Sequence, residues 1–320
     1  MSVTRSDLLA GLRMARFAVV SLGLIVLTSC QTAPPRPAAS APTGDEIVVA
    51  GQRFHTGTRV VTWLEPDGYN AYRGMPPLIP RPPAASLSPK EAAQVKERGW
   101  DLPTLQKAVD QFVLHYDAAG LSKVCFNVLH ARALNVHFML DVDGTIYQTL
   151  DLQERALHAT ISNDRSIGIE IANIGAYPPG ETKPLDDWYR RDAQGNTFLN
   201  VPGTIRVPGI RTKDFVGHPA RMAPVRGALQ GRELVQYDFT PQQYAALAKL
   251  TATLCRVFPK IACDFPHDSA GRLITRKLPD NELAKYHGII GHFHIQENKI
   301  DPGPAFQWQR VIADARKQMK

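Results

Sequence analysis

Two histidines and one aspartate occupy places in the sequence where a metal ion could be bound. His115 ends an apolar segment, His292 ends another in a Gly-His pair, and Asp301 follows nine residues after His292. Two imidazoles and one carboxylate leave a fourth position open on zinc, which is the arrangement of catalytic zinc sites. Since histidines often end strands without binding metal, the spacing alone leaves a structural role open for all three.

The elements that must position these residues alternate between strands and helices. Short runs of β-branched and aromatic residues predict strands; they lie at 46–50, 59–63, 112–115, 136–140, 145–150, 166–171 (with Gly168 inside) and 289–290. Capping boxes and apolar spacing predict helices; two begin at Ser88 and Thr240, and two cover 121–129 and about 304–317. Asp143-Gly144 predicts a hairpin. These elements predict an α/β fold with a mixed central β-sheet flanked by α-helices.

A long polar stretch interrupts this alternation. It runs from about 176 to 238 and is rich in Gly and Pro. Since structureless loops of this length are rare unless they are functional, we expect an insertion that forms a wall of a binding cleft. The sequence therefore predicts one catalytic domain over 45–320 that contains this insertion.

The N-terminus has the pattern of an export signal. Arg5, Arg13 and Arg16 precede an apolar run over 17–27. That run is too short to cross a hydrocarbon core of roughly 30 Å, so it predicts a cleaved signal rather than a spanning helix.

The four residues that end this signal, LTSC at 27–30, resemble the bacterial lipobox. The resemblance implies that residues 1–29 are a lipoprotein signal peptide and that Cys30 carries the lipid. Gln31 follows in place of Asp, which in such lipoproteins implies delivery to the outer membrane, facing the periplasm. Cys30 and the Pro/Ala-rich residues up to 44 would then tether the domain. The alternative is a plain signal peptide followed by a chance cysteine.

Composition excludes several classes of protein. Of 320 residues, 44% are hydrophobic and 21% charged, which rules out wholesale disorder. The net charge of +7 suits an anionic partner, but no Lys/Arg-rich run of the nucleic-acid type is present, so we expect no nucleic-acid binding. Nothing in the sequence demands more than a monomer. Four cysteines are too few for a disulfide scaffold: Cys125 is expected to be a buried thiol, and a disulfide between Cys255 and Cys263 stays open.

Five segments resemble the zinc-dependent N-acetylmuramoyl-L-alanine amidases, a family that includes phage lysozyme-amidases and is related to peptidoglycan-recognition proteins. They are FVLHYD (112–117), VHFMLDVDGTIYQ (136–148), RALHAT (155–160), SIGIEIAN (166–173) and GHFHIQENKIDPGPAFQW (291–308). Each segment is weak alone, but the five follow the family's order over about 112–308. The resemblance implies the amidase fold of that family, which is a mixed sheet packed by helices.

The resemblance also implies the roles of the site residues. The zinc ligands of the family fall on His115, His292 and Asp301, its catalytic carboxylate on Glu170 and its cleft lysine on Lys299. Zinc would activate a water, the carboxylate would move its proton to the leaving nitrogen, and the lysine would stabilise the oxyanion. Two departures stand out: Val136 occupies the place of a cleft tyrosine found in some relatives, and the loop from 292 to 301 is one residue short.

Other polar residues near these motifs have less certain roles. By resemblance, His158, Asn173 and Tyr116 are predicted to bind substrate. His137 is expected to be packed or to support a ligand, and His294 to orient His292. Glu170 could instead pair with an arginine, and Lys299 could be an ordinary loop cation.

The function implied is cleavage of the amide between N-acetylmuramic acid and L-alanine of the stem peptide. The expected partners are peptidoglycan or muropeptides, and a membrane through the lipid on Cys30. Two alternatives remain: a module that binds peptidoglycan without cutting it, and a zinc peptidase that acts within the stem peptide.

Overall fold

The computed structural model describes residues 43–74 and 77–320. Contacts divide the chain into Met1–Ala41 and Pro42–Lys320, and the architecture below is that of the second unit. The predicted signal peptide, Cys30 and most of the predicted tether lie outside the described residues. Within the described ranges, no helix has both the length and the apolar composition needed to cross a membrane.

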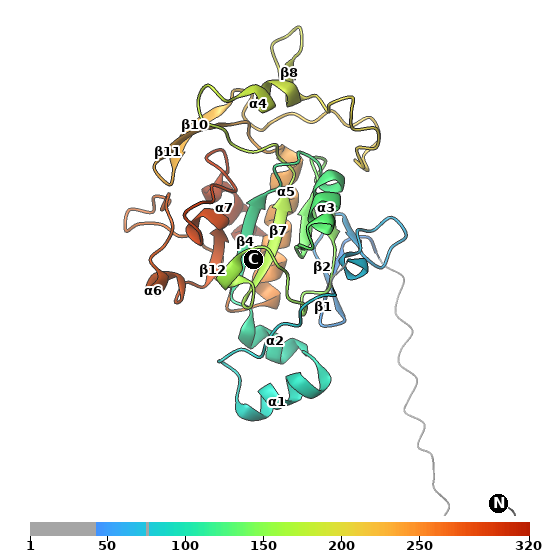
Figure 1. Cartoon of the computed structure of the whole chain (residues 1–320), viewed down its shortest axis with the longest axis vertical. Coiled ribbons are helices and arrows are strands. Elements are labelled where there is room, and N and C mark those ends of the chain that lie inside the picture. The colour runs from blue at the N-terminus through green and yellow to red at the C-terminus, as the bar shows by residue number, and fades with distance from the viewer. Residues whose placement is uncertain (1–42, 75–76) are drawn as a thin grey trace, which may run out of the picture. The chain divides into compact units, whose positions relative to one another are not determined.

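A six-stranded mixed sheet forms the centre of this unit (Figure 1), as the sequence predicts. In sheet order its strands are β12 (Gly288–Gly291), β4 (Gln111–Tyr116), β7 (Ser166–Ile171), β5 (Phe138–Leu140), β6 (Ile146–Gln148) and β3 (Val60–Thr62). Neighbouring strands are parallel except β5 and β6, which are the two arms of the predicted hairpin. The predicted strand segments are therefore confirmed with shifts of a few residues at their ends.

The two faces of the sheet are covered by different helices. On one face, alternate residues such as Phe112, Leu114 and Ile169 are fully buried in the main core, which includes residues of α5 (Pro241–Val257) and α7 (Trp308–Gln318). On the other face, α3 (Ser122–Ala131) packs over β5 and β6 through a cluster that contains Cys125 and Met139. Because side chains alternate along a strand, His115 and Glu170 point to this second face.

Helix starts follow the predicted capping chemistry. Ser88 and Thr240 form capping boxes at the starts of α1 (Pro89–Arg98) and α5. A third capping box at Asp101, which the sequence analysis missed, begins α2 (Leu102–Ala108). The expected start of the last helix near 304 is wrong: α7 begins at Trp308, because the chain before it turns tightly at Gly303, where φ is +91°.

Smaller elements complete the described chain. A hairpin of β1 (Glu46–Val49) and β2 (Gln52–His55) lies outside the central sheet. Short helices are η1 (Ala71–Arg73), η2 (Thr160–Ser162), α6 (Asp280–Leu283) and η3 (His292–His294). Cys125 is buried as predicted, and Cys125, Cys255 and Cys263 are all free thiols.

The insertion has secondary structure of its own. It contains α4 (Lys183–Trp188), two hairpin strands β8 (Tyr189–Arg191) and β9 (Thr197–Leu199), and a second hairpin of β10 (Val225–Leu229) and β11 (Arg232–Gln236). Trp188 and Tyr189 pack in one cluster with Leu121, Val142 and Ala172, which lie beyond the carboxyl ends of β4, β5 and β7. The insertion thus covers the carboxyl end of the sheet (Figure 1).

Two side chains, one on β6 and one in the turn between β5 and β6, fix the middle of the insertion. The hydroxyl of Tyr147 on β6 donates to the carbonyl of Gly209 at 3.2 Å. Asp143 accepts hydrogen bonds from the backbone and hydroxyl of Thr212 at 2.9 and 2.8 Å. The insertion is therefore held at both the centre and the edge of the sheet.

The contact between the insertion and the sheet predicts a glycine with an unusually large effect on stability. Gly120 has φ of +75°, and a Cβ added there would lie 2.5 Å from two atoms of the Trp188 ring. We expect Gly120→Ala to lower the free energy of unfolding by roughly 3 kcal/mol, because backbone strain and overpacking add together. Urea denaturation measures this change.

Gly195, at the tip of the β8–β9 hairpin, is the matched control. Its φ is +84°, but a Cβ there would meet nothing within 4 Å. Gly195→Ala should therefore lower the free energy of unfolding by only about 1 kcal/mol, which reflects backbone conformation alone. Equal effects of the two substitutions would contradict tight packing of Trp188 on Gly120.

Asp141, buried beneath the start of α3, predicts a pH-dependent stability. Its Oδ1 accepts backbone hydrogen bonds from Val142 and Ser122, while its Oδ2 has no partner among the described residues. Burial raises the pKa of Asp141 to about 7, and the nearby charge of Asp143 adds to the rise. The folded protein therefore holds a proton that the unfolded chain releases near pH 4, so this contribution to stability is lost as the pH rises toward 7.

Asp141→Asn should remove this contribution, because the amide keeps the Oδ1 acceptor and carries no charge. The free energy of unfolding of the variant relative to the parent is expected to rise between pH 4 and pH 8, by at most about 1.4 kcal/mol per pH unit. Asp186→Asn, at an exposed position of α4, is the control and should show no such trend. A flat difference for Asp141→Asn would rule out the raised pKa.

Candidate metal centre

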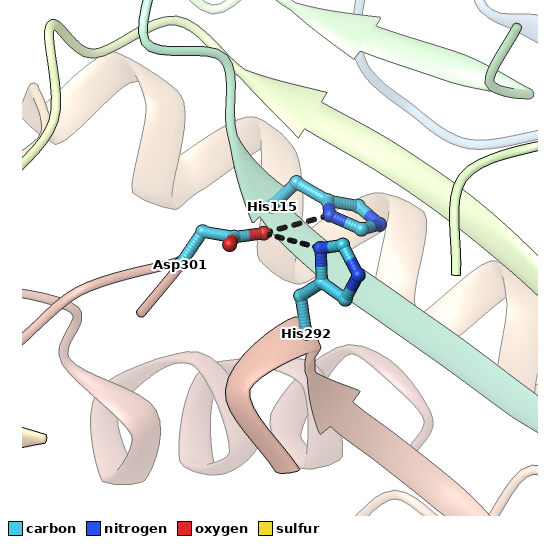
Figure 2. A group of neighbouring side chains, drawn as sticks. All are labelled: His115, His292 and Asp301. Carbon is cyan, nitrogen blue, oxygen red and sulfur yellow. Dashed lines mark hydrogen bonds and ion pairs between the residues drawn. The ribbon is translucent and has the colours of Figure 1, made fainter. Parts of the chain in front are cut away.

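Three distant parts of the chain bring His115, His292 and Asp301 together. His115 lies at the end of β4, His292 begins η3 directly after β12, and Asp301 follows in the next loop. Figure 2 shows both imidazoles directing a ring nitrogen to the same carboxylate oxygen of Asp301. The Nδ1 atoms of His115 and His292 lie 2.8 and 3.0 Å from Asp301 Oδ2. Within residues 43–74 and 77–320, this is the one group of at least three such residues that could hold a metal.

The chemistry of these donors fits a zinc ion. The residues are only 2%, 5% and 8% exposed, and their ligand atoms all lie within 4.8 Å of one another. Burial lowers the pKa of His115 to about 4, so the ring is neutral and keeps a lone pair for a metal. Burial alone would raise the pKa of Asp301, but the rings of His292 and His115 hold it below its ordinary value. Two imidazoles and one carboxylate form a common ligand set for zinc.

Each ligand imidazole is held from behind by a second side chain. Nε2 of His115 lies 3.1 Å from Nδ1 of His158, and Nε2 of His292 lies 2.6 Å from Oε1 of Gln296. Such contacts fix which nitrogen of a ligand histidine faces the metal. Gln296 was not predicted from the sequence, although it lies four residues after His292 and one helical turn brings such residues together.

Glu170, the predicted catalytic carboxylate, lies on β7 next to His115 on β4. It is the partner of His115 in the β4–β7 register, so both side chains project from the same face at the same level. Its Oε2 is buried and has no hydrogen-bond partner in the described part of the chain. Burial raises the pKa of Glu170 well above its ordinary value, and the charges of Asp301 and Asp117 add to this rise. A buried carboxylate oxygen without a partner is typical of a functional site.

Lys299 supplies a positive charge to the same region. It is partly buried and takes part in no ion pair with any described residue. Its charge counteracts the rise in the pKa of Glu170 and contributes to the lowered pKa of His115. The charge of Lys299 therefore influences both groups.

The other predicted contacts with substrate lie in different surroundings. Tyr116 follows His115 and points to the opposite face of the sheet, where its ring lies against Gly175. Asn173 is buried; its Oδ1 accepts from Gly175 and Gln236, and its Nδ2 donates to the carbonyl of Tyr237. Both side chains support the chain locally, and their contact with substrate stays a prediction.

Two further histidines hold the backbone around the centre. His137, expected to be packed, is fully buried; its Nδ1 accepts from the backbone of Gly168 and its Nε2 lies 3.1 Å from the carbonyl of Glu154. His294 accepts from the backbone of Gly291 through Nδ1, and its Nε2 lies 2.7 Å from the carbonyl of Ile274. His294 thus acts on the turn that carries His292 rather than on the ring itself.

The β10–β11 hairpin of the insertion braces the loops that carry two of the ligands. Gln230 donates to the carbonyls of Phe293 and Gln296 at 2.6 and 3.1 Å. Gln236 is fully buried; it donates to the carbonyl of Pro302 and accepts from the backbone of Ala305. This bracing role was not expected from the sequence, which assigned the insertion only to a cleft wall.

Comparison with known families gives this centre a context. The family model described as N-acetylmuramoyl-L-alanine amidase matches residues 105–304, well over half of the chain. A search of curated proteins gave no significant match.

Several solved amidase structures are similar to parts of the chain. A selenomethionine derivative of AmpD has 19% identity and a TM-score of 0.33, covering 65% of this chain and 86% of that one. The amidase AmiD from E. coli, in complex with the substrate anhydro-N-acetylmuramic acid-L-Ala-D-γ-Glu-L-Lys, has 18% identity and a TM-score of 0.35; the alignment covers 65% of this chain and 57% of AmiD. The endolysin amidase LysCS from Clostridium intestinale has 14% identity and a TM-score of 0.34, covering 66% and 86%.

Membership of a family rests on the match to the family model rather than on these structural similarities. That match includes the three ligand positions and also Glu170 and Lys299. The sequence match and the buried His-His-Asp centre agree with each other. The chain therefore belongs to the N-acetylmuramoyl-L-alanine amidase family.

Proposed function

We propose that the chain is a zinc amidase of the cell envelope that cleaves the bond between the lactyl group of N-acetylmuramic acid and L-alanine of the stem peptide. One observation carries this proposal: Nδ1 of His115, Nδ1 of His292 and Oδ2 of Asp301 converge where Glu170 pairs with His115 across two strands, and Oε2 of Glu170 has no partner among the described residues. AmiD, whose structure holds a muropeptide, supports peptidoglycan or muropeptides as the substrate class.

The residues of the centre divide the work of amide hydrolysis. His115, His292 and Asp301 would hold a zinc ion, which when bound would supply a Lewis acid and lower the pKa of a water molecule toward ~7. Glu170 has a high proton affinity and no competing hydrogen bond at Oε2, so it can accept a proton from the attacking water. The same carboxyl group can then give that proton to the leaving nitrogen. Lys299 would stabilise the negative charge that develops on the amide oxygen.

The predicted location in the envelope rests on the sequence of residues 1–44, most of which lie outside the described residues. The signal pattern, the LTSC segment and the Pro/Ala-rich stretch support export, a lipid on Cys30 and a position at the outer membrane facing the periplasm. An enzyme placed there would act on wall material rather than on cytoplasmic fragments.

Digestion of purified sacculi tests the activity and the roles together. The protein should hold one zinc per chain and release stem peptides with free L-alanine termini. Glu170→Gln should keep the zinc and lose at least about 100-fold in rate, because an amide cannot accept the proton. His115→Ala should lose both zinc and activity. Metal analysis and mass spectrometry of the released peptides give both readouts.

Glu233→Gln is the matched control, since Glu233 is exposed on β11, and it should leave zinc content and rate unchanged. Bound zinc without release of peptides would indicate a module that only binds peptidoglycan. Cut peptides still attached to muramic acid would indicate a zinc peptidase. A protein without zinc would show that the ligand set is wrong.

The lipid anchor is tested by Cys30→Ala in the full chain expressed in a Gram-negative host. The variant should leave the membrane fraction and fail to incorporate a labelled fatty acid, because no other cysteine lies at the end of the signal. Cys125→Ala, which changes a buried thiol, should remain in the membrane fraction. Membrane attachment of Cys30→Ala would contradict the proposed anchor.

A further inference from the structure

We infer that His158 is a positioning residue for the metal ligand His115, and that it acts through a hydrogen-bond relay that ends at Ser166. The inference rests on the proposed function, because it concerns how the zinc ligand is held. It differs from the substrate contact that the family resemblance implies for His158.

The relay is a chain of three side chains. Nε2 of His115 lies 3.1 Å from Nδ1 of His158, and Nε2 of His158 lies 3.3 Å from Oγ of Ser166. The two rings meet edge to face, with centroids 5.2 Å apart and planes at 90°. His158 therefore has a partner at each ring nitrogen.

The positions of the protons in the relay follow from which nitrogen of His115 faces the metal site. Nδ1 of His115 points at Asp301, so a metal bound there requires the lone pair of Nδ1 and leaves the proton on Nε2. That N–H donates to Nδ1 of His158. Nδ1 of His158 is then an acceptor, and its own proton lies on Nε2 and is donated to Ser166. Each of the two rings therefore carries its proton on Nε2. This arrangement fixes the ring orientation in which Nδ1 of His115 faces the metal.

The surrounding chain holds the His158 ring in this position. The backbone N–H groups of His158 and Ala159 both donate to Oδ1 of Asn163, at 3.1 and 2.7 Å. Beneath the ring lies Gly168 of β7, where an added Cβ would come within 2.6 Å of two ring atoms. The glycine inside the SIGIEI strand thus makes the space that the ring occupies.

Substitution of His158 should change different quantities depending on whether it positions a ligand or contacts substrate. A residue that touches only substrate affects KM and leaves metal affinity unchanged. A residue that fixes the tautomer and orientation of a ligand changes metal affinity even when no substrate is present. Because both ring nitrogens of His158 are already paired within the protein, the second outcome is expected.

The experiment is zinc titration of the purified protein against a chromogenic chelator, without substrate. His158→Phe, which keeps the ring volume but has no acceptor, should weaken zinc binding about 10- to 100-fold. His158→Asn, whose Oδ1 can replace the Nδ1 acceptor, should recover part of this loss. Ser166→Ala should weaken binding less than His158→Phe. The double variant His158→Phe/Ser166→Ala should bind no more weakly than His158→Phe, because the relay is already cut.

His130→Phe, on an exposed part of α3, is the matched control and should bind zinc as the parent does. Thermal unfolding of the metal-free proteins tests whether each variant folds. If His158→Phe does not fold, the zinc affinities of His158→Asn and Ser166→Ala are compared with that of the parent instead. Unchanged zinc affinity with a raised KM in the His158 variants would overturn the inference in favour of a substrate contact. Fully additive effects of His158 and Ser166 would also overturn the relay. A parent protein that binds no zinc would instead refute the proposed function itself.

Discussion

The convergence of two imidazoles on one carboxylate oxygen is the constraint on which the rest of the structure depends. A buried carboxylate is unfavourable unless it is paired or binds a metal, and Oδ2 of Asp301 lies within 3.0 Å of Nδ1 of both His115 and His292, where a metal would be shared. Apolar residues could not replace these three side chains, because a metal requires nitrogen and oxygen donor atoms of this kind. The β4–β7 register, the turn at η3 and the loop before α7 all serve to bring these three side chains together.

The support of this cluster reaches well beyond the residues that could bind zinc. His158 and Gln296 hold the outer nitrogens of the two imidazoles, and Gln230 and Gln236 hold the loops that carry His292 and Asp301. The two glutamines belong to an insertion that covers the carboxyl end of the sheet. The insertion is thus part of the framework of the site.

Much of this organisation could be predicted from the sequence, and the rest fails for physical reasons. The strands were identifiable because buried β-branched runs end in turn residues, and Ser88 and Thr240 marked helix starts because capping is a local interaction. The ligands His115, His292 and Asp301 became specific only through the family's motif order, since strand-end histidines are common. Gln236 and Gln230 carried no local signal: their partners lie about 60 to 70 residues away in sequence, and only the folded chain brings them into contact.

The sequence separation within the metal centre also has a consequence for how the protein folds. His115 and Asp301 are 186 residues apart, and β12 must pair in parallel with β4 before His292 can face His115. Pairing between such distant segments is slow, because the entropy of closing a long loop is lost before the contacts form. The complete ligand set therefore exists only late in folding, after most of the chain has found its place. Capture of the metal would then report completion of the fold, and a chain cut short before β12 would present His115 alone.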